Sequence, residues 1–229
     1  TKTSPQASAT SIKDILRSIV VLFKLRVVIL LVLSSLGGAL IASDGKVSLS
    51  ALGLLLGTGI LSSAGASAIN QYLERSSDAL MRRTLNRPLA AGIVSNPKAI
   101  LGIASGFIAI AIGLALLFGN PALALFLALG AAIYIGIYTV WLKPRTLLNI
   151  VIGGAAGSCA VLSGSAAAGN WSEPGAITLA LLVFIWTPTH FWSLAMAFRD
   201  DYSRAGVPML PTVVSDQATA WGIALHTGA

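Results

Sequence analysis

Three oxygen-bearing side chains recur at four-residue intervals directly after an apolar stretch of the chain. They are Asn70, Glu74 and Asp78, and neither Gly nor Pro interrupts the run between them. If the run is helical, these side chains form a stripe about 12 Å long on one face, because a helix rises 1.5 Å per residue. Mg²⁺ is usually held by one or two carboxylates together with waters and phosphate oxygens. The spacing therefore predicts a magnesium site.

Basic residues and a second acidic pair accompany this stripe. Asp200 and Asp201 follow another apolar stretch, next to Arg199. A guanidinium group binds two phosphate oxygens at once, so carboxylates beside arginines suit a magnesium diphosphate. The alternative is a solvated helix end whose exposed acids pair with arginines four residues away. Two acidic clusters favour the metal site, and the arginines that follow the first cluster are Arg75, Arg82, Arg83 and Arg87.

The composition indicates which class of protein carries these residues. Apolar residues make up 55% of the 229 residues and charged residues 10%, and the mean hydropathy is +0.84. A soluble globular domain has about 25% charged residues, and a disordered chain has low hydrophobicity. The composition therefore excludes both classes. Cys159 is the single cysteine, which excludes an internal disulfide and a multi-cysteine metal site.

Six apolar stretches without Asp, Glu, Lys or Arg are long enough for a helix to cross a bilayer core, which takes about 20 residues. A seventh run begins near Ala218 and is too short to cross, so we expect a piece of a longer membrane protein. The predicted fold is all-α, a polytopic membrane helical bundle with six complete spans and a truncated seventh. We expect a flexible N-terminal tail over residues 1–18 and a single transmembrane domain over 19–229. The predicted spans are 27–43, 49–69, 99–118, 121–142, 146–169 and 175–198.

The basic residues lie almost entirely on one side of these spans. Fourteen of the fifteen Lys and Arg residues precede the first span or fall in the second, fourth and sixth connections, and only Lys46 does not. By the positive-inside rule, that side faces the cytoplasm. Both acidic clusters lie there, so we expect a cytoplasmic site at a bacterial inner membrane, or at the mitochondrial inner membrane in a eukaryote. This topology explains the net charge of +7 without a nucleic-acid partner.

Four stretches carry a resemblance to known enzymes. They are the stripe with its continuation Ala-Leu-Met-Arg-Arg-Thr-Leu-Asn-Arg-Pro-Leu, the segment 138–157 with Lys-Pro-Arg-Thr and Asn-Ile-Val-Ile-Gly-Gly, the segment 186–195 with Thr-His-Phe-Trp, and the segment 201–211. The first resembles the UbiA superfamily of intramembrane prenyltransferases. All four together resemble, within it, the family of heme O synthases (protoheme IX farnesyltransferases), over about residues 20–215.

The resemblance implies a reaction and roles for the residues above. Farnesyl diphosphate loses its diphosphate with the help of bound Mg²⁺, the allylic cation is captured by a vinyl group of the substrate heme B, and water completes the side chain of heme O. Asn70, Glu74 and Asp78 are expected to be catalytic and to hold one Mg²⁺, and Asp200 and Asp201 to hold a second. The expected diphosphate contacts are Arg82, Arg87, Lys143 and Arg145. A downstream heme A synthase is an expected partner.

Some residues inside the predicted spans have two interpretations. His190 is the only ionisable side chain well inside a span, which favours a functional role such as heme binding. The alternative, equally supported, is a hydrogen bond to a Ser or Thr of a neighbouring helix. Tyr138 and Trp141 near a span end are predicted to be interfacial anchors, and a role at the mouth of the substrate site is the alternative.

Two other functions compete with this hypothesis. A UbiA-type enzyme that prenylates a quinone or chlorophyll precursor shares the acidic motifs, but it should lack the stretches around Asn149 and His190. A secondary transporter typically binds at the bilayer midplane with broken helices and inverted repeats. Here no acid lies inside a predicted span and no repeat is visible, so the enzyme is favoured.

Overall fold

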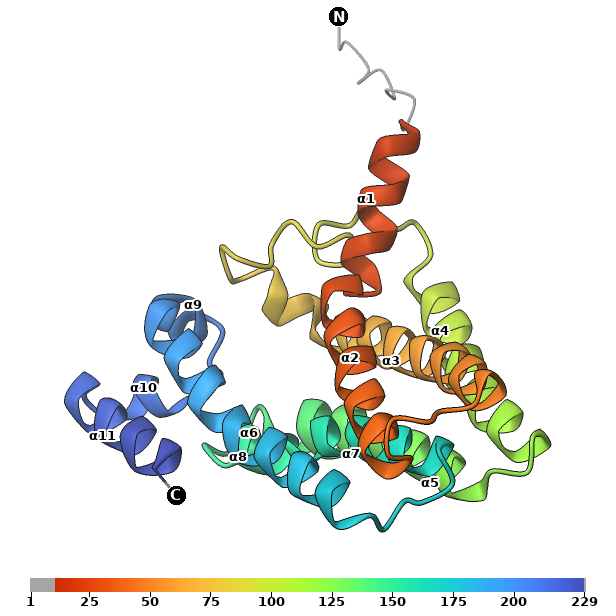
Figure 1. The fold of residues 1–229 in the computed structure, drawn as a ribbon. Helices are drawn as coiled ribbons and strands as arrows, with labels where there is room; N and C mark the ends of the chain where they lie inside the picture. Colours follow the sequence, from red (N-terminus) through yellow and green to blue (C-terminus); the bar gives the residue numbers. More distant parts are fainter. Residues whose placement is uncertain (1–10, 229) are drawn as a thin grey trace, which may run out of the picture.

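The structure, a computed structural model, describes residues 11–228 and is helical throughout its regular elements (Figure 1). Six helical segments in these residues are long and apolar enough to cross a membrane. The fourth of these segments consists of the helix α5 and the π-helix η1, which follows it without a break. The elements are α1 Ile12–Leu22, α2 Leu25–Ala42, α3 Leu49–Asp78, α4 Pro97–Leu117, α5 Pro121–Ala131, η1 Ala132–Leu142, α6 Asn149–Gly153, α7 Ala155–Ala167, α8 Pro174–Ala197, α9 Arg199–Arg204, α10 Leu210–Val213 and α11 Asp216–Thr227.

All six predicted spans are confirmed, with bounds close to those of the apolar runs. The largest difference is in α3, which continues through the polar run to Asp78. This run contains no helix breaker, so the helix extends beyond the apolar residues that predicted it. The seventh apolar run forms the short helix α11, which packs against α8.

The N-terminal boundary differs from the expected one. Residues 12–18, predicted to belong to a flexible tail, form the first turns of α1, and residues 1–10 lie outside the described residues. The Ser11 side chain caps this helix by accepting a hydrogen bond from the Lys13 backbone amide. The Ser/Thr-rich composition of the first residues concealed a regular amphipathic pattern that begins at Ile12.

Small residues allow the spans to pack closely. Helices α2 and α7 lie side by side, and a Cβ atom added at Gly164 would overlap the backbone carbonyl oxygen of Ser35. A Cβ atom at Gly38 would overlap the carbonyl oxygen of Val161 in the same way. Such close backbone approach is typical of helix association in membranes, where apolar burial gives little driving force between helices.

The π-helix η1 changes which side chains of the fourth span face its neighbours. Lys143 donates its backbone amide to the Tyr138 carbonyl at 2.8 Å, and the Thr139 hydroxyl donates to the Tyr134 carbonyl at 2.7 Å, both across five residues. π-Helical turns are rare and frequently occur at functional sites. Here η1 packs against α3, with Thr139 and the adjacent Lys143 contacting α3 side chains, while Tyr134 accepts a hydrogen bond from Lys24.

Candidate active site

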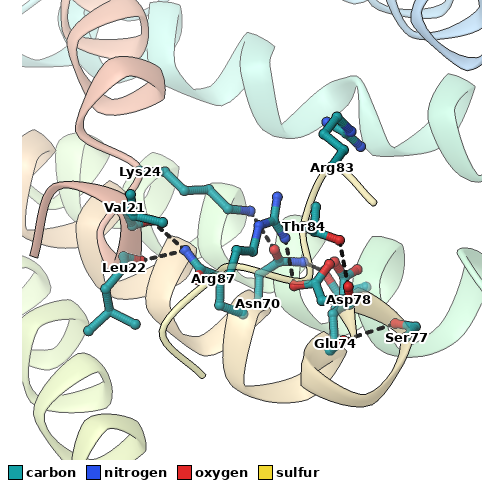
Figure 2. A network of polar contacts seen from close by, with 12 residues as sticks. Val21, Leu22, Lys24, Asn70, Glu74, Ser77, Asp78, Arg83, Thr84 and Arg87 are labelled. Atoms are coloured by element: carbon teal, nitrogen blue, oxygen red, sulfur yellow. Dashed lines mark hydrogen bonds and ion pairs between the residues drawn. The ribbon is translucent and has the colours of Figure 1, made fainter. Parts of the chain in front are cut away.

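The stripe predicted on the second span exists, but it is buried. Asn70, Glu74 and Asp78 all belong to α3 and are 1%, 9% and 3% exposed. The interpretation of this run as a solvated helix end with exposed acids is therefore wrong. The four-residue period does place the three side chains on one face of α3, as expected, and Figure 2 shows them gathered there.

A cationic side chain from a different segment contacts each member of the stripe. Lys24 Nζ donates to Asn70 Oδ1 at 2.6 Å, Lys143 Nζ to Glu74 Oε1 at 2.5 Å, and Arg87 Nη1 to Asp78 Oδ2 at 2.6 Å (Figure 2 draws the Lys24 and Arg87 contacts). A buried carboxylate without a partner would cost several kcal/mol. The three basic side chains therefore satisfy buried oxygen atoms of the stripe and gather at the same place.

Lys24 was not singled out from the sequence, where it is one of several bases before the first span. It lies at the break between α1 and α2 with a left-handed backbone conformation, φ 47°. Its ammonium group also donates to the Tyr134 hydroxyl at 3.1 Å. Burial, with the nearby charges of Arg87 and Lys143, lowers the pKa of Lys24 from 10.5 to about 7. Its position as a single base within the apolar stretch 19–25 was the available signal.

A buried amide holds this break against α3. Gln71 Nε2 donates to the carbonyl oxygens of Val21 at 2.6 Å and Leu22 at 2.9 Å, which are the last residues of α1. Asn70 Nδ2 donates to the Thr139 hydroxyl at 3.0 Å. The same turn of α3 therefore fixes both the α1–α2 junction and η1. Neither contact follows from the local sequence pattern.

The second acidic cluster meets the first through the segment that follows α3. Asp201 Oδ2 accepts a hydrogen bond from the Arg83 backbone amide at 3.1 Å, and Asp201 also pairs with Arg204. Desolvation opposes ionisation of Asp201, but the backbone amides of Arg83 and Arg82 and the Arg204 guanidinium hold its pKa below the ordinary value. The two segments, far apart in the sequence, therefore lie together in the fold.

An open cavity of about 390 Å³ lies at this junction. Asp200 and Arg82, both exposed, line it with the last turn of α8 and the start of α9. Arg82 and Asp200 were predicted for diphosphate and metal, respectively. The lining residues are Arg82, Met196, Ala197, Phe198, Arg199, Asp200, Asp201 and Arg204.

Two predicted site residues contact neither acidic cluster. Arg145 is exposed and donates to the carbonyl oxygens of Val140 and Trp141 at 2.8 Å and 2.7 Å, so it caps the end of η1. His190 is exposed on α8, and its ring stacks on Trp186 with centroids 4.6 Å apart. The structure therefore gathers Arg82, Arg87 and Lys143 near the acids but leaves Arg145 and His190 outside.

Of the two predicted aromatic anchors, only one is at the surface. Trp141 is 59% exposed at the end of the span. Tyr138 is half-buried and stacks on Tyr134 with ring centroids 5.9 Å apart, and the Lys143 ammonium lies 5.6 Å from its ring centre. The ring of Tyr138 also packs against the buried cluster around Met81 and Ile150, and its role as an interfacial anchor stays a prediction.

The donor set fits a magnesium ion that substrate oxygens help to hold. Within residues 11–228, no three His, Cys, Asp or Glu side chains converge as a complete metal site. Glu74 and Asp78 each use one carboxylate oxygen in their ion pair, and the other accepts no hydrogen bond from the described residues. Carboxylate oxygens completed by waters and phosphates are the usual ligands of Mg²⁺.

Comparison with known proteins identifies relatives along nearly the whole chain. The UbiA prenyltransferase family matches residues 31–229. The protoheme IX farnesyltransferase of Metallosphaera sedula is 45% identical over 218 residues, which cover 95% of this chain and 75% of that protein. Protoheme IX farnesyltransferase 2 of Paramagnetospirillum magneticum is 47% identical over 199 residues, covering 86% of this chain and 68% of that protein.

Two solved structures share the fold at low sequence identity. One is described as a UbiA homolog from Archaeoglobus fulgidus bound to DMAPP and Mg²⁺; it has a TM-score of 0.74 and 18% identity and covers 92% of this chain and 74% of its own. The other is described as a digeranylgeranylglyceryl phosphate synthase, with a TM-score of 0.73, 17% identity, and 92% and 73% of the two chains covered. These likenesses show a common helical architecture.

Proposed function

The chain belongs to the UbiA prenyltransferase family, and from this premise we propose that it transfers the farnesyl group of farnesyl diphosphate to a vinyl group of heme B, giving heme O and diphosphate. Two relatives that are 45% and 47% identical to the chain are named protoheme IX farnesyltransferases, which supports heme as the acceptor. The observation that carries the proposal is the buried stripe with a cation on each of its three members. Family membership also decides against a secondary transporter.

The cationic side chains bind the diphosphate in this proposal. Lys24, Lys143 and Arg87 already lie within hydrogen-bond distance of the stripe, so a small change in side-chain torsion redirects each to a phosphate oxygen. Arg82 approaches from the cavity. Preorganised positive charge stabilises the leaving group most strongly where water is excluded.

When the basic side chains turn toward the diphosphate, the carboxylates that they contacted become available to bind Mg²⁺. Bound Mg²⁺ supplies Lewis acid chemistry, stabilising the charge that develops on the departing diphosphate. Glu74 and Asp78, with Asn70 between them and the membrane interior, would hold one ion, and Asp200 with Asp201 a second. For the second ion Asp201 has to share oxygens that now bind Arg83 and Arg204, so Asp200 is the more accessible ligand.

The acceptor in this proposal is a vinyl group of heme B. The vinyl carbon of heme B forms a bond with the farnesyl cation, water adds to the neighbouring carbon, and a proton is released. The apolar membrane interior keeps bulk water from the cation until then. His190, stacked on Trp186, is the candidate contact for heme. We place the site on the cytoplasmic face, where a heme A synthase would receive the product.

Heme O formation in membranes tests this function. Membranes containing the full-length protein, given heme B, farnesyl diphosphate and Mg²⁺, are expected to yield farnesylated heme detectable by chromatography with mass detection. Chelation by EDTA should abolish it. Asp78→Asn should lower the rate by roughly 100-fold or more, because metal and diphosphate stabilisation contribute several kcal/mol.

Asp44→Asn is the matched control, since Asp44 is exposed before α3 and far along the helix from the stripe. It should retain the wild-type rate. Active membranes that prenylate a quinone precursor but never heme would contradict the acceptor assignment. Full activity of Asp78→Asn would contradict the metal assignment instead.

A further inference from the structure

Helix α1 has two chemically different faces. Lys13, Asp14, Arg17 and Ser18 occupy one side of its eleven residues. At 100° per residue the opposite side carries a continuous aliphatic band, and its members are 42–76% exposed. This band consists of Ile12, Ile15, Leu16, Ile19 and Val20. Solvent exposure of five aliphatic side chains on one short helix is unfavourable in water, so the band requires a cover.

The rest of the described chain does not provide that cover. Among the helices α1 contacts only α2 and α3, at its C-terminal end, and it projects away from the bundle in Figure 1. Leu22 is the buried residue of this helix, and Gln71 binds the carbonyl oxygens of Val21 and Leu22. The helix is therefore attached at one end while its aliphatic band remains open along its length.

The band continues a surface that faces lipid. Immediately after the break at Lys24, the first membrane span α2 exposes large aliphatic side chains, among them Ile29, Leu30 and Leu33. Lys24 and Arg26 mark the end of that span, where the hydrocarbon region meets the headgroups. The C-terminal end of α1 thus lies next to the end of the lipid-facing surface of α2.

We propose that α1 is an interfacial helix whose aliphatic band rests in the headgroup region of the bilayer. Lys13 and Arg17 then extend toward lipid phosphates, as is typical of basic amphipathic helices at membrane surfaces. A second copy of the chain is a poorer occupant, because a helix about 16 Å long falls well short of the ~800 Å² per partner of a stable interface. The proposal rests on the membrane spans and is independent of the reaction.

This placement links the membrane surface to the site. The last turn of α1 is hydrogen-bonded to Gln71, and a single residue, Phe23, separates it from Lys24, which contacts Asn70. Lipid contact along α1 therefore restrains the segment from which the Lys24 side chain enters the site.

Depth-dependent fluorescence quenching tests the proposal. In a Cys159→Ser background, Ile15→Cys and Ile19→Cys place a bimane label on the aliphatic band, and Lys13→Cys and Arg17→Cys place it on the polar face as matched controls. The full-length protein is reconstituted in nanodiscs of phosphatidylcholine and phosphatidylglycerol carrying nitroxide lipids labelled near the headgroup. We expect several-fold stronger quenching on the aliphatic band, and stronger reaction of the polar-face cysteines with an impermeant maleimide.

Equal quenching on both faces would overturn the proposal, because a helix in water has no preferred side toward lipid. Weak quenching at Ile15 and Ile19 together with excimer emission of pyrene at Ile19→Cys would assign the band to a second copy instead. All four positions are exposed, so the variants are expected to fold, and thermal unfolding of each labelled protein verifies this.

Discussion

At the scale of residues, the three cations of the site are not equivalent. Lys143 and Arg87 neutralise buried carboxylates, so removing either would leave a charge unpaired and cost about 3–5 kcal/mol of stability. Lys24 instead pairs with the neutral amide of Asn70. Its loss leaves no buried charge behind, which makes it the residue whose role in binding can be separated from folding.

We predict that Lys24→Met folds normally but binds diphosphate roughly 10–100-fold more weakly, since a hydrogen bond to a charged group contributes about 1.5–3 kcal/mol. Lys24→Arg should recover part of the affinity. Calorimetric titration with inorganic diphosphate and Mg²⁺ measures both. Lys98→Met, at an exposed position on α4, is the control and should bind as the wild type does. Wild-type affinity in Lys24→Met would remove Lys24 from the diphosphate site.

At the scale of elements, close helix contacts set the position of the site-bearing segments. The α2–α7 contact depends on glycine at two places where any side chain would overlap a backbone carbonyl. α2 begins next to Lys24, and α7 packs against α5, whose continuation η1 supplies Lys143. Separation of α2 from α7 would therefore move two of the three cations relative to α3.

Gly164→Ala is accordingly expected to lower stability by about 1–3 kcal/mol, the usual cost of forcing an extra carbon into a packed interior. The readout is the midpoint of thermal unfolding in detergent. Gly113→Ala is the matched control, because Gly113 lies inside α4 with open space around its Cβ position. It should be neutral or slightly stabilising, since Ala favours a helix over Gly. An unchanged midpoint for Gly164→Ala would mean that α2 and α7 lie farther apart.

At the scale of the whole molecule, the site lies at the end of the bundle that carries nearly all the basic residues. The stripe is at the C-terminal end of α3, and the second cluster follows the C-terminal end of α8. Both ends meet the segment between α3 and α4 through Asp78 and Asp201. Site and basic surface therefore share one side of the membrane.

We predict that this side is cytoplasmic. In a Cys159→Ser background, Lys46→Cys lies before α3 and Ser95→Cys before α4, so one membrane crossing separates them. In intact spheroplasts an impermeant maleimide should label Lys46→Cys, and Ser95→Cys only after permeabilisation. The reverse labelling pattern would invert the topology and place the site on the outer face.

Local pattern was sufficient for the spans and for the stripe, because apolar length determines which segments cross a bilayer and helical period determines which side chains share a face. Asn70, Glu74 and Asp78 follow from that period alone. Their burial, the contact of Lys24 with Asn70, and the bond between Arg83 and Asp201 join segments 46 to 118 residues apart and came only from the tertiary structure. So did η1, since the five-residue hydrogen bonds that accompany the contacts of Thr139 and Lys143 with α3 are imposed by packing against neighbours and leave no mark in residue propensities.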